Sequence, residues 1–162
     1  MNIFATSDSP IDCAIVLDDI RLNKMIVESG QMLSSALYKN NICDIFYKPA
    51  YLKHPCTIWA STTKQNFQWL LDHGLAMCVT FEMITGKVHK TERVLWNMRD
   101  YSLFMPSSHR TEFEDCTYFK GRIDIDVHEK YKLHLNHKWQ QDADPKWSKR
   151  KIPDFFVPKV IT

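Results

Sequence analysis

Two long stretches in which apolar residues recur at three- and four-residue steps constrain the fold of this chain most strongly. The first stretch covers residues 11–38 and the second covers residues 55–86. Steps of three and four place side chains on one face of an α-helix. Proline is favoured in the first turn of a helix, and Pro10 and Pro55 stand where the two stretches begin. The sequence therefore predicts two long helical regions. A bend is expected near residues 17–19 and near residues 62–66.

Shorter elements follow the second helical region. Residues 91–99 and 128–141 show further helical patterns, and Gly86 is expected to cap the helix before them. Residues 100–120 lack a helical period and predict a long irregular loop.

The expected fold class is mostly α, a compact single-domain helical bundle over residues 1–162 with a long irregular loop and a basic C-terminal tail. Residues 1–7 are expected to form a short extended segment. Residues 42–53 are ambiguous, and Pro49 argues against one continuous helix there. A chain of 162 residues is long enough to bury one core.

Composition excludes several classes of protein. No apolar run reaches the roughly 18 residues of a membrane span, and the first residues carry no export signal. We therefore expect a cytoplasmic protein without a membrane partner. The cysteines are odd in number and widely spaced, which predicts reduced thiols. No cysteine and histidine grouping has zinc-site spacing along the chain, so neither a metal nor another cofactor is expected. The cysteines are Cys13, Cys43, Cys56, Cys78 and Cys116.

Positive charge gathers near the end of the chain. Residues 120–162 carry ten Lys and Arg against six Asp and Glu, whereas residues 1–119 carry eleven against thirteen. Basic residues beside aromatic ones suit phosphate contacts combined with base stacking. The alternative is a mildly basic, solvated helix. The residues that would contact nucleic acid here are Lys138, Trp139, Lys146 and Trp147.

A polar stripe on the first long helix has the clearest chemical pattern. Arg21, Lys24, Glu28 and Gln31 follow one another at steps of three, four and three, so they share one helix face. Such a stripe places cations beside a carboxylate, as a phosphate contact next to a reacting sugar would require. The alternative is a solvent-facing stripe in which Lys24 and Glu28 form an ordinary ion pair.

Three segments in order resemble one known family. LDDIRLNKMIVESGQML resembles the signature of the pyrimidine-dimer DNA glycosylases of the phage endonuclease V type. The run from His54 to Trp59, with residues 66–70 after it, is similar to that family's His-Pro helix start, and Gly86-Lys87-Val88-His89 fits its phage branch. Residues 131–156 are similar to the C-terminal pattern of the same branch.

This resemblance implies a compact helical bundle and a defined chemistry. A free amine attacks the sugar C1′ as the glycosidic bond breaks, and a glutamate, here Glu28, stabilises the sugar and manages protons. The amine is that of Met1, since Met-Asn is a poor substrate for methionine removal, or that of Asn2 if the methionine is removed, and Lys24 is the back-up candidate. An α-amine has an ordinary pKa of about 7.7–8.0, whereas a lysine has one near 10.4, so the α-amine is the better nucleophile near neutrality. Arg21 and Gln31 match positions that contact DNA.

Two histidines, His54 and His89, each allow two interpretations. His54 stands before Pro55, where it suits either a phosphate contact at a helix start or a cap of the turn. His89 follows Lys87 and is either a site residue or a histidine at a helix end on the surface. His54, Lys87 and His89 are all candidate nucleic-acid contacts.

The preferred function is a base-excision enzyme that acts on damaged or modified pyrimidines in double-stranded DNA, with or without cleavage of the strand at the resulting abasic site. It needs no cofactor and is expected to be a monomer. Two alternatives remain at this point: a non-catalytic relative that binds DNA or protein, and a protein that binds or processes a pyrimidine nucleotide in the same pocket.

Overall fold

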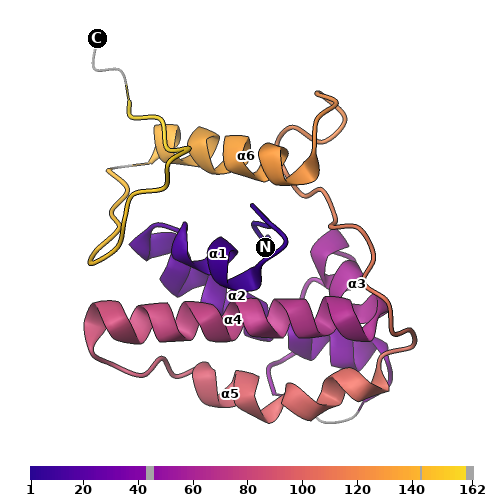
Figure 1. The fold of residues 1–162 in the computed structure, drawn as a ribbon. Helices are drawn as coiled ribbons and strands as arrows, with labels where there is room; N and C mark the ends of the chain where they lie inside the picture. The colour runs from indigo at the N-terminus through magenta and orange to yellow at the C-terminus, as the bar shows by residue number, and fades with distance from the viewer. Residues whose placement is uncertain (43–45, 143, 160–162) are drawn as a thin grey trace.

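The computed structural model describes residues 1–42, 46–142 and 144–159. Within these ranges the chain forms α-helices and one 3-10 helix and no strand, which confirms the mostly α prediction (Figure 1). In chain order the helices are α1 (Pro10–Ile15), α2 (Asp19–Lys39), α3 (Pro55–Thr62), α4 (Lys64–Thr85), α5 (Glu92–Asn97), η1 (Arg99–Phe104) and α6 (Val127–Gln141).

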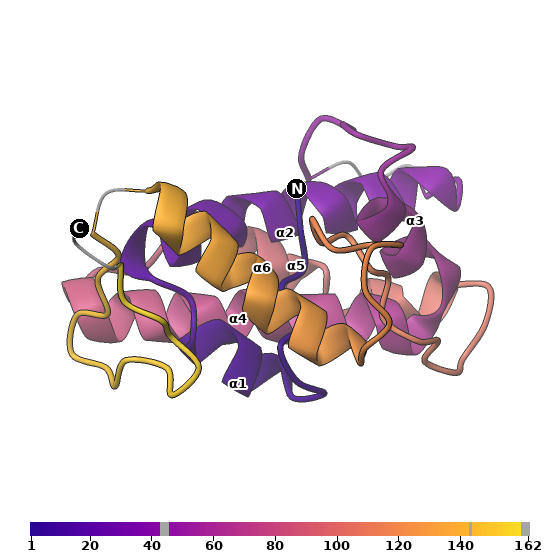
Figure 2. The same ribbon diagram turned by 90° about the horizontal axis from the view of Figure 1, so that it is seen from above.

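The helices form a stack in which α4 lies between α5 and the N-terminal helices. Both α1 and α2 pack on α4, and α3 packs on α2. Helix α6 crosses over α1 and α2 on the side away from α4, and the chain start lies beneath it (Figures 1 and 2). Fully buried side chains from all these layers form one core, among them Ile3, Ile26, Leu70, Tyr131 and Leu135.

The first helical region bends where the sequence predicts it. Helix α1 begins at Pro10, and the Ser9 hydroxyl accepts a hydrogen bond from the backbone N–H of Asp12. Helix α2 begins after Asp18, whose carboxylate accepts the backbone N–H of Arg21 at 3.2 Å. Each cap satisfies one of the N–H groups that a helix start leaves without a partner.

The second region is also divided as predicted. Helix α3 begins at Pro55 and ends at Thr62, and Thr63 then caps α4 by accepting the backbone N–H of Asn66 at 3.0 Å. Helix α4 ends at Thr85, and Gly86, which has φ +71°, caps its C-terminus. Only glycine adopts this left-handed conformation without a steric penalty, so it closes the helix.

Three segments differ from the prediction or extend it. The predicted loop of residues 100–120 starts inside η1, because residues 99–104 form a 3-10 helix before the irregular part. Residues 1–7 form no β-strand. The backbone turns at the buried Phe4, which has a positive φ of +42°. No helix occurs in the described part of residues 42–53, while residues 43–45, which include Cys43, lie outside the described residues.

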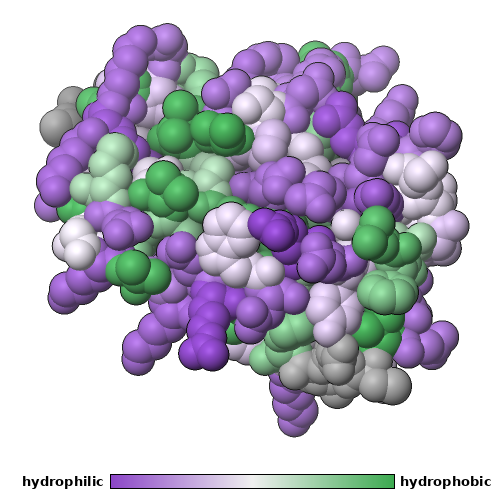
Figure 3. Space-filling model, turned by 60° about the horizontal axis from the view of Figure 1, so that its bottom comes forward, coloured by the Kyte–Doolittle hydropathy of each residue, from purple (hydrophilic) through white to green (hydrophobic). Residues whose placement is uncertain are grey.

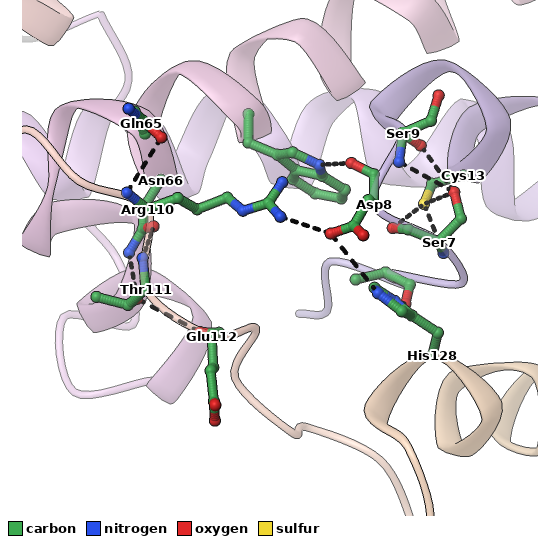
Figure 4. Close-up of polar contacts among 12 residues, drawn as sticks. Ser7, Asp8, Ser9, Cys13, Gln65, Asn66, Arg110, Thr111, Glu112 and His128 are labelled. Atoms are coloured by element: carbon green, nitrogen blue, oxygen red, sulfur yellow. Dashed lines mark hydrogen bonds and ion pairs between the residues drawn. The ribbon is translucent and has the colours of Figure 1, made fainter.

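The segment after the chain start is held by the loop that precedes α6 and by α6 itself. In Figure 4 the Asp8 carboxylate lies between Arg110 and His128. Its Oδ1 is 2.5 Å from Arg110 Nη2 and 3.8 Å from His128 Nε2. His128 Nδ1 also lies 2.6 Å from the backbone oxygen of Ala5. These contacts join three segments that are far apart in the sequence.

The face that includes α5 carries a mixed surface. Small clusters of apolar side chains alternate with hydrophilic side chains over it (Figure 3).

Among the described residues, no helix combines the length and the apolar character that a membrane crossing requires.

A buried histidine predicts how stability depends on pH. His73 in α4 is 1% exposed and lies beside the ring of Trp69, and burial lowers the pKa of His73 to about 4. As the pH falls from about 6.5 to about 4, the unfolded chain takes up a proton at this position and the folded chain does not. We therefore expect the free energy of unfolding to decrease over this window, by roughly 2–3 kcal/mol from this residue.

Urea unfolding of the native protein and of His73→Leu at pH 7 and pH 4.5 measures this contribution. The variant should lose less stability between the two pH values than the native protein does. Equal losses in the two proteins would contradict the prediction.

Candidate active site

A cavity of about 650 Å³ opens between the chain start, α2 and α6. Its volume lies within the range of about 300–1,000 Å³ that is usual for ligand pockets. Positive groups on its wall are the Met1 amine, Arg21, Lys24 and Lys138, and negative groups are Asp18, Glu28 and Asp142. The wall also includes Asn2, Phe4, Cys116 and His134.

The N-terminal amine of Met1 and the carboxylate of Glu28, the glutamate of the polar stripe on α2, lie close together in this cavity. The Met1 nitrogen lies 3.5 Å from Glu28 Oε2, and Lys24 Nζ lies 3.6 Å from Glu28 Oε1. The Met1 side chain is 2% exposed and that of Glu28 is 14% exposed, whereas the Lys24 side chain is 70% exposed. The structure thus brings together the three residues that the sequence nominated for catalysis, and gives the two amines different surroundings.

Asn2 fixes the position of the chain start. Its Oδ1 accepts the backbone N–H groups of Ile3 at 2.8 Å and Phe4 at 3.0 Å, and its Nδ2 donates to the backbone oxygen of Cys116 at 3.1 Å. Asn2 is 7% exposed, so these bonds are shielded from water. Sequence reasoning missed this role, although asparagine is a residue type that commonly bonds to the backbone of its neighbours.

Arg21 is held by two carboxylates. Its Nη1 donates to Asp18 Oδ1 at 2.8 Å, and its Nη2 donates to Asp142 Oδ2. Asp18 is 1% exposed, and its Oδ1 also accepts the indole N–H of Trp139 at 2.9 Å. The guanidinium therefore lines the cavity as part of an ion-pair network.

His134 on α6 is a wall residue that sequence reasoning missed. It is 7% exposed and stacks on Phe4, with 5.8 Å between the ring centroids. Its Nδ1 accepts the backbone N–H of Tyr118 at 3.0 Å. Burial, together with the positive charge of Lys138, lowers the pKa of His134 to about 4. The ring is therefore neutral near pH 7, with its proton on Nε2.

The prediction that two tryptophans stack on DNA bases is wrong. Trp139 is fully buried and Trp147 is 8% exposed, because both rings pack with Phe156 in the core beneath the tail. The Trp147 indole N–H donates to the backbone oxygen of Val16 at 2.9 Å. Neither ring offers a face to a base. Tryptophan beside lysine is the same pattern whether the ring stacks on a ligand or packs in a core.

The two neighbouring lysines differ. Lys138 lines the cavity, whereas Lys146 is exposed and does not line it, and its backbone oxygen accepts the N–H of Asp19. In the basic tail, Arg150 donates to the carboxylate of Asp19 and to the backbone oxygen of Leu17. This part of the tail thus seals the junction between α1 and α2.

Four other predicted contacts do not line the cavity: Gln31, His54, Lys87 and His89. His54 caps α3, since its Nδ1 accepts the backbone N–H of Cys56 at 3.2 Å. His89 Nδ1 accepts the N–H of Thr91, which fits a histidine at a helix end. Lys87 and His89 belong to the loop between α4 and α5 (Figure 1), and α6 lies on the other side of α4.

Two cysteines approach each other next to the chain start. Cys56 Sγ lies 3.0 Å from Cys116 Sγ, and His54 adjoins them. The hydrogen bond to Cys116, together with burial, raises the pKa of Cys56, and the same hydrogen bond lowers the pKa of Cys116. Cys13, Cys56, Cys78 and Cys116 are all free thiols, as the sequence predicted.

Comparison with known proteins identifies a family for the first part of the chain. The family model described as pyrimidine dimer DNA glycosylase matches residues 1–91, which is more than half of the chain and includes Met1, Lys24 and Glu28. No curated protein and no solved structure matches the chain significantly.

The ion-pair network predicts an effect on stability. Asp18→Ala removes the partner of Arg21 Nη1, leaving Asp142 as the remaining ion-pair partner of Arg21, and leaves the buried indole N–H of Trp139 unpaired. We expect it to lower the free energy of unfolding by roughly 3–5 kcal/mol. The matched control is Asp126→Ala, which removes the cap of α6 near the surface and should cost about 1 kcal/mol. Chemical denaturation of both variants measures the difference, and equal losses would show that the network contributes little.

Proposed function

The chain belongs to the pyrimidine dimer DNA glycosylase family, and we propose that it removes damaged or modified pyrimidines from double-stranded DNA, with the Met1 amine as nucleophile and Glu28 as the assisting carboxylate. Family membership supports DNA binding and glycosylase activity in general. The single observation that carries the detailed proposal is the 3.5 Å approach of the Met1 nitrogen to Glu28 Oε2 on the wall of a cavity. We place this activity in the cytoplasm and assign it to a monomer.

The first chemical step is displacement of the base. The unprotonated amine uses its lone pair to form a bond to the sugar C1′, while the bond from C1′ to the base nitrogen breaks and its electron pair leaves with the base. The base then gains a proton. The carboxylate of Glu28 stabilises the positive charge that develops on the sugar. A partly enclosed cavity strengthens this interaction, because fewer water molecules screen it.

A second step explains how strand cleavage would follow. The amine bound to C1′ loses a proton, and its lone pair then forms the second bond to C1′ while the C1′–O4′ bond breaks. O4′ leaves with the electron pair of that bond and takes up a proton, which opens the sugar ring and gives an imine between C1′ and the amine. Removal of a proton from C2′ then sends electrons toward C3′, and the 3′ phosphate leaves. Glu28 lies beside the same nitrogen and is suited to accept and return these protons.

Two observations favour the chain-start amine over Lys24. The Met1 side chain is 2% exposed and Asn2 holds the backbone that carries the amine, whereas the Lys24 side chain is 70% exposed. An ordered nucleophile loses less conformational entropy when it attacks than a mobile one does. An exposed lysine also lacks the burial that usually activates such a residue.

The cations of the cavity supply sites for phosphate. Lys24 and Lys138 bring positive charge to the wall. Arg21 pairs with the buried Asp18 on one side and with Asp142, whose side chain is 47% exposed, on the other. An exposed ion pair contributes little stability, so a DNA phosphate can take the place of Asp142 while Asp18 keeps the guanidinium in position.

Trapping with borohydride tests the nucleophile directly. We expect the protein to form a covalent adduct with duplex DNA that contains an abasic site or an ultraviolet photoproduct. Borohydride reduces the imine, and mass spectrometry of the digested adduct locates the attached sugar. The intact mass of the protein must show that it begins at Met1. Attachment at Lys24 would contradict the assignment of Met1, and base release without any adduct would contradict an amine nucleophile altogether.

Substitution of the carboxylate tests its role. Glu28→Gln keeps the shape and removes the charge, so we expect base release to slow by about 10²–10⁴ while DNA affinity stays within a few fold. Glu129→Gln in α6 is the matched control, since Glu129 forms an exposed pair with Lys132. Absence of base release from any damaged duplex by the native protein, with salt-dependent DNA binding intact, would favour a non-catalytic relative. Saturable binding of a mononucleotide that duplex DNA does not compete would favour a nucleotide-binding protein.

A further inference from the structure

Three metal-ligating side chains gather at the edge of the cavity. One ligand atom from each of His54, Cys56 and Cys116 lies within 4.8 Å of the other two. The two cysteines are 60 positions apart in the chain, one in the first turn of α3 and the other in the segment before α6. Cys56 is fully buried, His54 and Cys116 are partly buried, and Cys116 lines the cavity. The fold thus assembles a group that the spacing in the sequence does not show.

The donor set is specific for one class of metal ion. One imidazole nitrogen and two thiolates suit a borderline or soft divalent ion, above all Zn²⁺, and do not suit Mg²⁺ or Ca²⁺. Tetrahedral zinc with bonds of about 2.3 Å to sulfur holds its two sulfurs about 3.8 Å apart. The 3.0 Å pair therefore has to open by about 0.8 Å, which is a small movement of two side chains.

The surrounding bonds fix these ligands. The backbone N–H of Cys116 donates to the hydroxyl of the fully buried Tyr131 at 3.2 Å, and its backbone oxygen accepts Asn2 Nδ2 at 3.1 Å. His54 Nδ1 accepts the N–H of Cys56 at 3.2 Å, so this nitrogen keeps its lone pair and the ring proton is on Nε2. A metal ion would take that lone pair in place of a long hydrogen bond.

We propose that His54, Cys56 and Cys116 bind one Zn²⁺ ion, which braces the start of α3 against the segment that anchors Asn2 and the chain start. Zinc binding exchanges the two thiol protons for bonds to the metal and involves no oxidation or reduction. Three protein ligands leave a fourth position for water. Binding itself does not rest on the proposed glycosylase activity, since its ligands are distinct from Met1, Lys24 and Glu28.

Cobalt substitution tests the site without DNA. The reduced, metal-free protein is titrated with Co²⁺, which has visible absorption bands in tetrahedral sites and charge-transfer bands with thiolate ligands. We expect both sets of bands to saturate at one equivalent and to disappear when Zn²⁺ is added. Cys116→Ser should remove the charge-transfer intensity in part and weaken metal binding by more than tenfold, roughly the smallest effect expected for lost ligation. Cys78→Ala, which removes a thiol far along α4, should behave as the native protein.

A second measurement tests whether the metal orders the N-terminal segment. It compares the native protein with and without Zn²⁺, so the result does not depend on a variant that could misfold. Hydrogen exchange should slow at the backbone amides of Ile3 and Phe4 when Zn²⁺ is added to the native protein, and should not respond in His54→Gln, whose partly exposed ring tolerates replacement. Circular dichroism shows that each variant is folded. Cobalt spectra without thiolate bands would overturn the proposal. So would an intramolecular Cys56–Cys116 disulfide in the isolated protein whose reduced form binds no Zn²⁺.

Discussion

The buried carboxylate of Asp18 is the interaction on which the cavity depends. It caps α2 through the N–H of Arg21, accepts the side chain of the same arginine, and accepts the indole of Trp139 from α6. Helix α6 covers the N-terminus and forms the lid of the cavity. The contact of Trp139 with Asp18 therefore fixes this lid to α2, the helix that carries Glu28. A carboxylate at 1% exposure is stable only when its acceptor sites are filled, and these bonds fill them. Asp18 therefore caps α2, joins α2 to α6 and shapes the cavity.

Much of the helical framework could be predicted from the sequence because it has local causes. Apolar spacing located the long helices, and Pro10, Pro55 and Gly86 marked where helices begin or end. Residues 99–104 were missed as a 3-10 helix, since such a short helix has little periodicity. The buried Phe4 at φ +42° was also unpredictable, because the bonds of Asn2 and the overlying α6 impose that conformation.

Spacing along the sequence could group site residues only where they share a helix, whereas the family resemblance nominated Met1 and the basic and aromatic pattern nominated Lys138. Arg21, Lys24 and Glu28 lie on one face of α2, and spacing alone grouped them. The contributions of His134 and Cys116 depend on long-range packing that no local pattern encodes. The tryptophans show that a local pattern can also mislead. Trp139 stands beside a lysine, as a base-stacking residue would, and yet its buried indole N–H donates to Asp18 and joins α6 to α2. Spacing along the chain likewise argued against a metal, and only the fold brings Cys116 to His54 and Cys56.

The placement of the chain start connects stability with chemistry. A chain start usually lies free in solvent, because its charge is well hydrated and its backbone has few partners. Here Asn2 holds the backbone, the Met1 side chain is buried, and Glu28 faces the amine. Burying a flexible terminus costs conformational entropy and hydration, so the fold must supply compensating contacts. It supplies them through Asn2, through Cys116 and through the α6 lid that Asp18 secures. An ordered amine beside a carboxylate is hard to explain as a device for stability alone, since an exposed terminus would cost less. The same arrangement supports the amine-dependent attack on a sugar that we propose.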